Sequence, residues 1–149
     1  MIDAYPNSRN VIPGRTFITV DFRHPDDNVL SQMDRALRDS VAEICHKSGL
    51  KYELEQIFYY APIPFDKGCV SAVRAGADRM GYSAREIVTG AGHDACFIAQ
   101  SAPTSMIFIP CIDGNSHNEV TDIKPHLAHA GSTVILQAHK YKANVSATA

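Results

Sequence analysis

Two glycines flank an alanine at positions 90–92, and this short run stands between a predicted strand and a predicted helix. Glycine lets a backbone approach a ligand closely, and the N–H groups that open a helix favour anions. The spacing of Gly90, Gly92 and Ala95 also fits a dinucleotide-binding fingerprint, with Asp113 near the place of the ribose-binding acid. Three interpretations stay open: a plain tight turn, a loop that binds a small anionic or carbonyl substrate, and a nucleotide site.

A histidine, His117, lies in the polar loop Gly114-Asn115-Ser116-His117-Asn118-Glu119, directly after an apolar run that predicts a buried strand. Ligands commonly bind at this edge of an α/β sheet, and an imidazole there can hold a metal or transfer a proton. A catalytic zinc site needs about three protein ligands, and the chain's other histidines show no such spacing. The pattern alone leaves a solvated loop histidine and a metal ligand both open.

Arg23 ends an alternating segment, residues 16–23, on the face that it shares with Asp21. A guanidinium there could bind a carboxylate through two parallel hydrogen bonds. Asn10 precedes the turn Pro13-Gly14 and offers both a donor and an acceptor. The alternative for Arg23 is a surface ion pair with Asp21, which would contribute little stability.

A serine or cysteine nucleophile has little support in the sequence. The chain contains no Gly-x-Ser-x-Gly elbow, which argues against a serine hydrolase. Its four cysteines form no Cys-x-x-Cys pair, and Cys96, although close to His93, does not stand at a clear helix start beside a base. We expect reduced, mostly buried thiols in a reducing cytoplasm, and the first residues lack the pattern of a secretory signal.

Two α/β segments are predicted to position these residues. In the first, residues 16–23 form a strand with Ile18, Val20 and Phe22 on its core face, a helix begins at Asp26 or Asp27 and ends at Gly49, and residues 51–60 form a second strand. This β-α-β unit is too small to cover both faces of its own sheet, which predicts a partner chain or a longer protein. Two prolines in residues 61–64 predict a domain junction near position 61.

The second segment repeats the α/β pattern. The sequence predicts a helix over 66–80, a short strand over 85–88, a short helix over 93–100, a strand over 106–109 and a last helix over about 122–139. Asp122 is the expected cap of the last helix, and Pro125 lies in its first turn. The predicted fold class is therefore α/β or α+β.

Composition excludes several classes of protein. The chain has 149 residues and a formal net charge of −2, which excludes a broadly basic nucleic-acid binder but leaves a local basic pocket open. No apolar run approaches the roughly 20 residues of a membrane-spanning helix. Ordinary apolar content, at 45% of residues, also argues against disorder.

Five motifs, taken together and in order, resemble the hydantoinase/carbamoylase amidases of the wider M20 group of metal-dependent hydrolases. That group includes N-carbamoyl-L-amino acid hydrolase, β-ureidopropionase and allantoate amidohydrolase. The motifs are Pro6-Asn7-Ser8-Arg9-Asn10-Val11-Ile12-Pro13-Gly14, Val20-Asp21-Phe22-Arg23-His24, Gly90-Ala91-Gly92-His93-Asp94-Ala95, Met106-Ile107-Phe108-Ile109-Pro110 and Gly114-Asn115-Ser116-His117-Asn118-Glu119.

This resemblance implies a fold and a chemistry. Residues 1–61 would be half of a β-α-β lid and dimerisation domain, and residues 62–149 would be the C-terminal part of a zinc-peptidase-like α/β catalytic domain. By similarity, Asn10 and Arg23 would hold the substrate carboxylate, and the turn of Gly90, Ala91 and Gly92 would contact the substrate. His117 would bind one of two divalent metal ions, commonly zinc, sometimes manganese, cobalt or nickel.

The implied reaction is hydrolysis of the linear amide C–N bond of an N-carbamoyl-L-amino acid or a related ureido acid, in a cytoplasmic homodimer. The family's other metal ligands, its general-base glutamate and a lid histidine have no counterpart in this chain, and Asn115 stands where the family has an apolar residue. We therefore expect a fragment that is inactive alone and leaves the metal pair unfilled. A non-catalytic oligomerisation module and a nucleotide-binding module that uses Gly90 and Gly92 are the alternatives.

Overall fold

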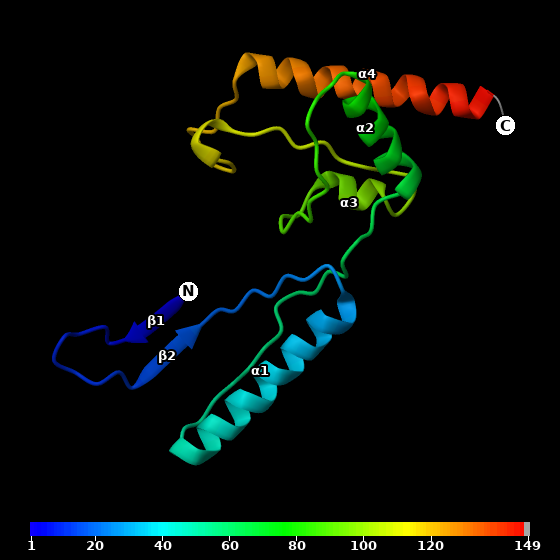
Figure 1. The fold of residues 1–149 in the computed structure, drawn as a ribbon. Coiled ribbons are helices and arrows are strands. Elements are labelled where there is room, and N and C mark those ends of the chain that lie inside the picture. The colour runs from blue at the N-terminus through cyan, green and yellow to red at the C-terminus, as the bar shows by residue number, and fades with distance from the viewer. Residues whose placement is uncertain (148–149) are drawn as a thin grey trace. The chain divides into compact units, whose positions relative to one another are not determined.

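A computed structural model describes the backbone of residues 1–147 and the side chains of residues 1–143. The chain divides into two compact units, Met1–Pro62 and Ile63–Ala149 (Figure 1). Both helices and strands occur, as the predicted mixed α/β class requires. The assignment of these units to a lid and a catalytic domain stays a prediction.

The first unit opens with an antiparallel hairpin. Strand β1 (Ile2–Tyr5) pairs with β2 (Arg15–Ile18) so that Ile2 faces Ile18 and Tyr5 faces Arg15. Strand β1 is not among the predicted strands, and the strand expected over 16–23 ends at Ile18. Of the three residues predicted for its core face, Ile18 and Val20 are 57% and 51% exposed, against expectation, whereas Phe22 is half-buried.

Helix α1 (Asp27–Ser48) confirms the predicted bounds, and each end has a local cause. The carboxylate of Asp26 accepts a hydrogen bond from the Asn28 N–H, 2.8 Å away, which satisfies one of the N–H groups without an intrahelical partner. Gly49 ends the helix in the left-handed region, at φ 66°, where a side chain is disfavoured.

Residues 51–60 do not form the predicted second strand, so the β-α-β unit is absent from the structure. Figure 1 shows this segment running back along α1 as an open trace. The Tyr59 hydroxyl donates a hydrogen bond to the carboxylate of Asp27, which holds the segment near the start of α1. A strand needs a neighbour for its N–H and C=O groups, and this stretch has no ladder with β1 or β2.

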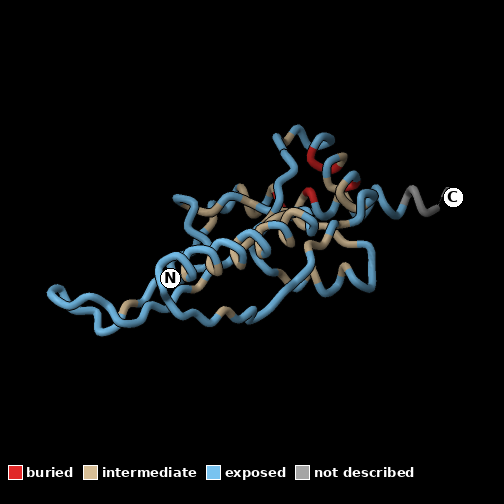
Figure 2. Tube along the Cα trace, turned by 90° about the horizontal axis from the view of Figure 1, so that it is seen from below, coloured by how far each residue is buried: buried red, intermediate tan, exposed pale blue. Residues whose placement is uncertain are grey.

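The core lies in the second unit, between helices α2 (Lys67–Arg79) and α4 (Pro125–Ala147) (Figure 2). Small residues on α2 make this contact possible: Ala72, Gly76 and Ala77 are buried there, and Val134 is buried on α4. A Cβ placed on Gly76 would lie 3.1 Å from the Val134 carbonyl oxygen, so the backbones of the two helices approach closely. Asp66 caps α2, since its carboxylate accepts a hydrogen bond from the Cys69 N–H.

The remaining elements of the second unit are short. Helix α3 (Asp94–Ile98) and the 3-10 turn η1 (Ile112–Gly114) stand between α2 and α4 in the sequence. The segments 85–88 and 106–109 are not strands, against expectation, since the only ladder in the described chain is that of β1 with β2. Helix α4 begins at Pro125 rather than at the expected Asp122 and extends beyond residue 139.

Much apolar surface is exposed in both units. Of residues 1–62, all of them described, none is buried. The large side chains that are more than half exposed include Ile57, Phe58, Val88, Phe97 and Leu136. The four cysteines are half-buried free thiols rather than buried ones. No helix in the described part of the chain has the length and apolar character needed to cross a membrane.

Candidate functional site

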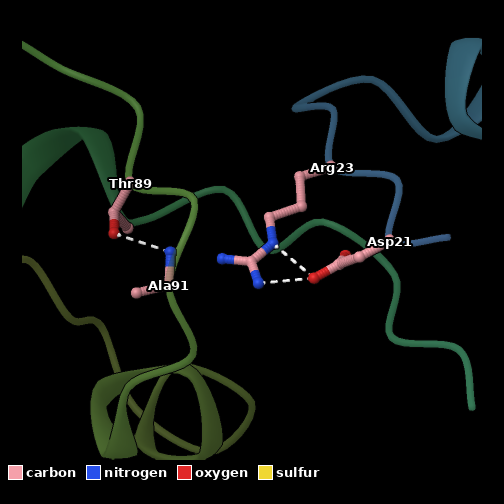
Figure 3. A network of polar contacts seen from close by, with 4 residues as sticks. All are labelled: Asp21, Arg23, Thr89 and Ala91. Atoms are coloured by element: carbon pink, nitrogen blue, oxygen red, sulfur yellow. Dashed lines mark hydrogen bonds and ion pairs between the residues drawn. The ribbon is translucent and has the colours of Figure 1, made fainter. Parts of the chain in front are cut away.

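Arg23 and Asp21 form an ion pair just beyond β2 (Figure 3). The Arg23 Nε and Nη2 groups both donate to one oxygen, Asp21 Oδ2, at 3.1 and 2.5 Å. They lie on the same side of the chain because residues two apart in an extended segment share a face. The hydrogen bond from Arg23 lowers the pKa of Asp21 below its ordinary value of 3.8.

Asn10 lies in the loop that joins β1 to β2. The Ser8 hydroxyl donates to Asn10 Oδ1 at 2.8 Å, and so occupies the acceptor end of the amide. The donor end, Nδ2, is the group that could bind a carboxylate oxygen. This polarity matches the role that the resemblance gives to Asn10.

The hairpin places Asn10 and Arg23 at its opposite ends. The loop that carries Asn10 follows the Tyr5–Arg15 pair, whereas Arg23 lies beyond the Ile2–Ile18 pair. The Thr19 N–H still donates to the Met1 carbonyl at 3.0 Å, and Figure 1 shows the chain leaving β2 on the side away from the loop. The ladder alone spans roughly 10 Å at about 3.3 Å per residue. One chain therefore does not bring these two side chains to one small carboxylate.

The turn at residues 89–92 is held by a threonine. The Thr89 hydroxyl oxygen accepts a hydrogen bond from the Ala91 N–H at 3.2 Å, a local side-chain turn that Figure 3 shows. This bond occupies the Ala91 donor, so a ligand at the turn would bind other groups of it. Since segment 85–88 is not a strand and α3 has only five residues, the geometry does not support the nucleotide interpretation.

His93, which is not among the residues predicted for the site, has a fixed ring next to this turn. Its Nε2 lies 3.1 Å from the Thr89 hydroxyl oxygen, and its ring packs edge-on against Phe108 with centroids 5.5 Å apart. The ring is half-buried. Two signals in the sequence point to it: its place in the motif Gly90-Ala91-Gly92-His93-Asp94-Ala95 and its four-residue spacing from Thr89.

The loop that carries His117 is closed by its own hydrogen bonds. The Ile112 N–H donates to the Asp122 carbonyl at 2.8 Å and joins the two ends of the loop. Inside it, the Val120 N–H donates to Asn118 Oδ1 at 3.2 Å, and the Asn118 N–H donates to the Thr121 hydroxyl at 3.1 Å. His117 itself adopts φ 56°, a left-handed conformation that is uncommon for a residue with a side chain.

The described residues contain no cluster of three or more side chains able to hold a metal ion. His117 contributes one exposed imidazole, and a metal centre of the kind that the resemblance implies needs several donors. The residues of this chain therefore do not by themselves fit a metal pair.

Comparison with known proteins gives consistent matches. A sequence profile described as "Peptidase family M20/M25/M40" matches residues 5–140. The N-carbamoyl-L-amino-acid amidohydrolase of Rhizobium meliloti is 44% identical over 133 residues, which are 89% of this chain and 32% of that protein. The allantoate amidohydrolase of Escherichia coli is 35% identical over 141 residues, 93% of this chain and 34% of that protein.

Among solved structures, an amidase of the hydantoinase/carbamoylase family from Burkholderia multivorans is 64% identical, with a TM-score of 0.90. The match covers 93% of this chain and 34% of that one. The chain thus spans about a third of the length of the curated relatives that it matches.

Proposed function

The chain belongs to the peptidase family M20/M25/M40, and from that premise we propose that it is part of an amidohydrolase that cleaves the linear amide bond of N-carbamoyl-L-amino acids or related ureido acids. One observation carries the proposal: 44% identity, over 89% of this chain, with an enzyme named for that reaction. Allantoate, the substrate that the Escherichia coli relative is named for, is also a ureido acid.

The proposed role of the first unit is to hold the substrate by its carboxylate. A guanidinium offers paired donors that match the two oxygens of a carboxylate, so Arg23 would fix both the position and the orientation of the substrate. This orientation would raise the rate of hydrolysis, because an amide bond that is held in the wrong position reacts slowly. In the second unit, the turn of Gly90, Ala91 and Gly92 would contact the substrate backbone.

We propose His117 as one ligand of a divalent metal pair whose other ligands lie outside this chain. The closed loop with a left-handed residue at its tip holds the imidazole at the surface, where a second group of ligands could meet it. Because the chain's own residues do not make a metal site, no catalytic step is assigned to the metal. The residues present bind and orient the substrate.

The proposal further places Asn10 and Arg23 of different copies in one site. The hairpin separates the two side chains within a copy, while both have the donors that a carboxylate needs. A homodimer built through residues 1–61 as a lid and dimerisation domain, with residues 62–149 in the catalytic domain, would meet this requirement. The exposed Ile18 and Val20 face, which otherwise favours an oligomerisation module, agrees with such an interface.

A chimeric enzyme tests the function directly. Residues 1–149 replace the matching third of the Rhizobium meliloti amidohydrolase, and the unmodified enzyme is the control. We expect the chimeric enzyme to hydrolyse N-carbamoyl-L-amino acids, whereas the 149-residue chain alone has no activity. A folded chimeric enzyme without activity, or a chelator-sensitive activity of the chain alone, would contradict the proposal.

Mixed dimers test the shared site. The variants Asn10→Ala and Arg23→Ala of the chimeric enzyme are each expected to lose activity, and co-refolding them should restore about a quarter of it, because half of the dimers are mixed and each has one intact site. If both side chains act within one copy, mixing restores nothing.

A further inference from the structure

One hydroxyl joins the turn of residues 90–92 to the ring of His93. Thr89 Oγ1 accepts a hydrogen bond from the Ala91 N–H at 3.2 Å, as Figure 3 shows, and it lies 3.1 Å from His93 Nε2. All three residues belong to the second unit, and Thr89 and His93 are half-buried. The turn is therefore tied to a side chain beyond its end as well as to the residue before it.

The hydrogen-bonding capacity of the hydroxyl gives the contact with His93 a direction. A threonine hydroxyl has one proton and two lone pairs, and the Ala91 N–H occupies one of the lone pairs. If the hydroxyl donates its proton to Nε2, the two bonds form a chain in which each strengthens the other. With Nε2–H as the donor instead, the hydroxyl proton would have no partner among the residues that the structure describes. We therefore expect Thr89 to be the donor, so that the neutral ring of His93 carries its proton on Nδ1.

His93 is itself held on two sides. Its ring packs against Phe108 with the planes at 62°, an edge-to-face arrangement that aromatic rings favour. Its carbonyl accepts a hydrogen bond from the Cys96 N–H at 2.9 Å, at the start of α3. Because both the ring and the backbone of His93 are held, its contact with Thr89 fixes the hydroxyl and, through the hydroxyl, the Ala91 N–H.

The turn needs such support because two of its three residues are glycines. Glycine has more backbone freedom than any other residue, so a free turn of this composition loses binding free energy when a ligand orders it. At Gly92 the described residues do not require a glycine, since an added Cβ would meet no atom within 4 Å and φ is outside the left-handed region. The missing side chain leaves room for another molecule to approach the backbone, as a substrate would.

We propose that Thr89 is a positioning residue for the substrate-binding turn: its hydroxyl accepts from the Ala91 N–H and donates to His93 Nε2, which presets the backbone of residues 90–92 for the substrate. This inference rests on the proposed role of the turn and deepens it. Thr89 touches no reacting atom and acts only through the turn.

The first test uses the 149-residue chain itself. Two-bond ¹H–¹⁵N NMR spectra of the histidine rings, recorded at alkaline pH where the rings are neutral, distinguish the two tautomers. We expect the proton of His93 to be on Nδ1 in the unmodified chain and in Thr89→Ser, and to shift toward Nε2 in Thr89→Val, which keeps the branched shape without the hydroxyl. A His93 ring protonated on Nε2 in the unmodified chain would overturn the proposal.

Thr104→Val is the matched control for this experiment. It removes a hydroxyl of another half-buried threonine, which donates to the Ala102 carbonyl at 2.8 Å. The His93 signals should be unchanged in this variant. If Thr104→Val shifts them as much as Thr89→Val does, the shift reports a general disturbance of the second unit, and the proposal is refuted.

The second test measures kinetics in the chimeric enzyme with an N-carbamoyl-L-amino acid. Thr89→Val is expected to raise KM about threefold to tenfold with little change in kcat, because the substrate must then order the turn itself. Thr89→Ser, which keeps the hydroxyl, should restore KM, and Thr104→Val should change neither constant. An equal loss in Thr89→Ser and Thr89→Val would indicate a loss of packing rather than of the hydrogen bonds, and would refute the positioning role.

Gly92→Ala separates this proposal from the role of the turn on which it rests. An added Cβ has room within the chain, so a higher KM in this variant would show that the turn meets the substrate. If Gly92→Ala leaves KM unchanged, the proposed role of the turn fails, and the role of Thr89 fails with it. If Gly92→Ala raises KM but Thr89→Val does not, the turn binds the substrate without the help of Thr89, and only the positioning role is refuted.

Discussion

Replacement of Gly131 by alanine tests how tightly the second unit holds the segment before the His117 loop. Gly131 is buried in α4, and an added Cβ would lie 2.9 Å from Ile109 Cγ2. Carbon atoms in contact prefer about 3.5 to 4.0 Å, and the branched Ile109 side chain is stiff, so it has to move. Overpacking of this kind costs about 1–3 kcal/mol, and alanine recovers about 1 kcal/mol of helix propensity.

The expected net effect of Gly131→Ala is a loss of about 1 kcal/mol in the free energy of unfolding. Urea unfolding of the 149-residue chain, followed by circular dichroism at 222 nm, measures it. In an Ile109→Ala background the added methyl group meets no obstacle, so the overpacking cost disappears and the cost of Gly131→Ala should fall by about 2 kcal/mol in a double-mutant cycle.

Gly92→Ala is the matched control. An added Cβ there meets no atom within 4 Å, and Gly92 does not adopt the left-handed conformation that disfavours a side chain. We expect no loss of stability from this change. The reasoning is wrong if Gly131→Ala is as stable as the unmodified chain, or if its cost is the same with and without the Ile109 side chain.

Three further outcomes follow from the contacts described. His117→Ala in the chimeric enzyme should reduce bound metal, measured by elemental analysis, whereas alanine at the exposed His126 should not. Asp26→Ala removes the cap of α1 and should lower the free energy of unfolding by about 1 kcal/mol, while Asp26→Asn restores it in the same urea assay. The hydrogen bond from the Cys69 N–H lowers the pKa of Asp66 below 3.8. The ionised Asp66 therefore stabilises the fold above about pH 4, and this stability is lost as the pH falls through the lower pKa of the folded state. The loss of stability between these pH values should be absent from acid unfolding of Asp66→Asn.

The helices were predictable because their signals are local. Asp26, Asp66 and Gly49 stand at the caps that the sequence indicated, and the apolar spacing between them has the period of a helix. The start of α4 is the exception. Asp122 accepts a hydrogen bond from the Ile123 N–H next to it and so does not cap the helix, which begins at Pro125.

The strands were not predictable in the same way, because a strand exists only with a partner. The runs 51–60 and 106–109 have the composition of strands, but no described segment pairs with them. The hairpin is a strand pair that the sequence did not indicate. Its register depends on a turn and on the first strand, Ile2–Tyr5, which is too short to show an alternating pattern.

In the candidate site, too, contacts between residues close in sequence were predictable, whereas the placement of residues far apart in sequence was not. The Asp21–Arg23 pair could be expected from a two-residue spacing, and the structure contains it. The separation of Asn10 from Arg23 depends on the direction of β2 through the hairpin, which no spacing indicates. The left-handed conformation of His117 depends on the hydrogen bonds that close its loop, and these involve residues on both sides of it.

The exposed surface links the fold to the proposed function. The chain exposes 12,242 Å². Two separate globules of the sizes of the two units would expose only about 9,000 Å². The excess, on the order of 3,000 Å², is what an obligate interface covers. Any burial between the two units would only lower the exposed area, so the comparison with separate globules gives a lower limit for the excess. The curated relatives are about three times as long as this chain, so under the proposed function the rest of such an enzyme would cover part of this surface. On this reasoning the 149-residue chain alone should self-associate, and in the chimeric enzyme the same apolar side chains should become protected from solvent.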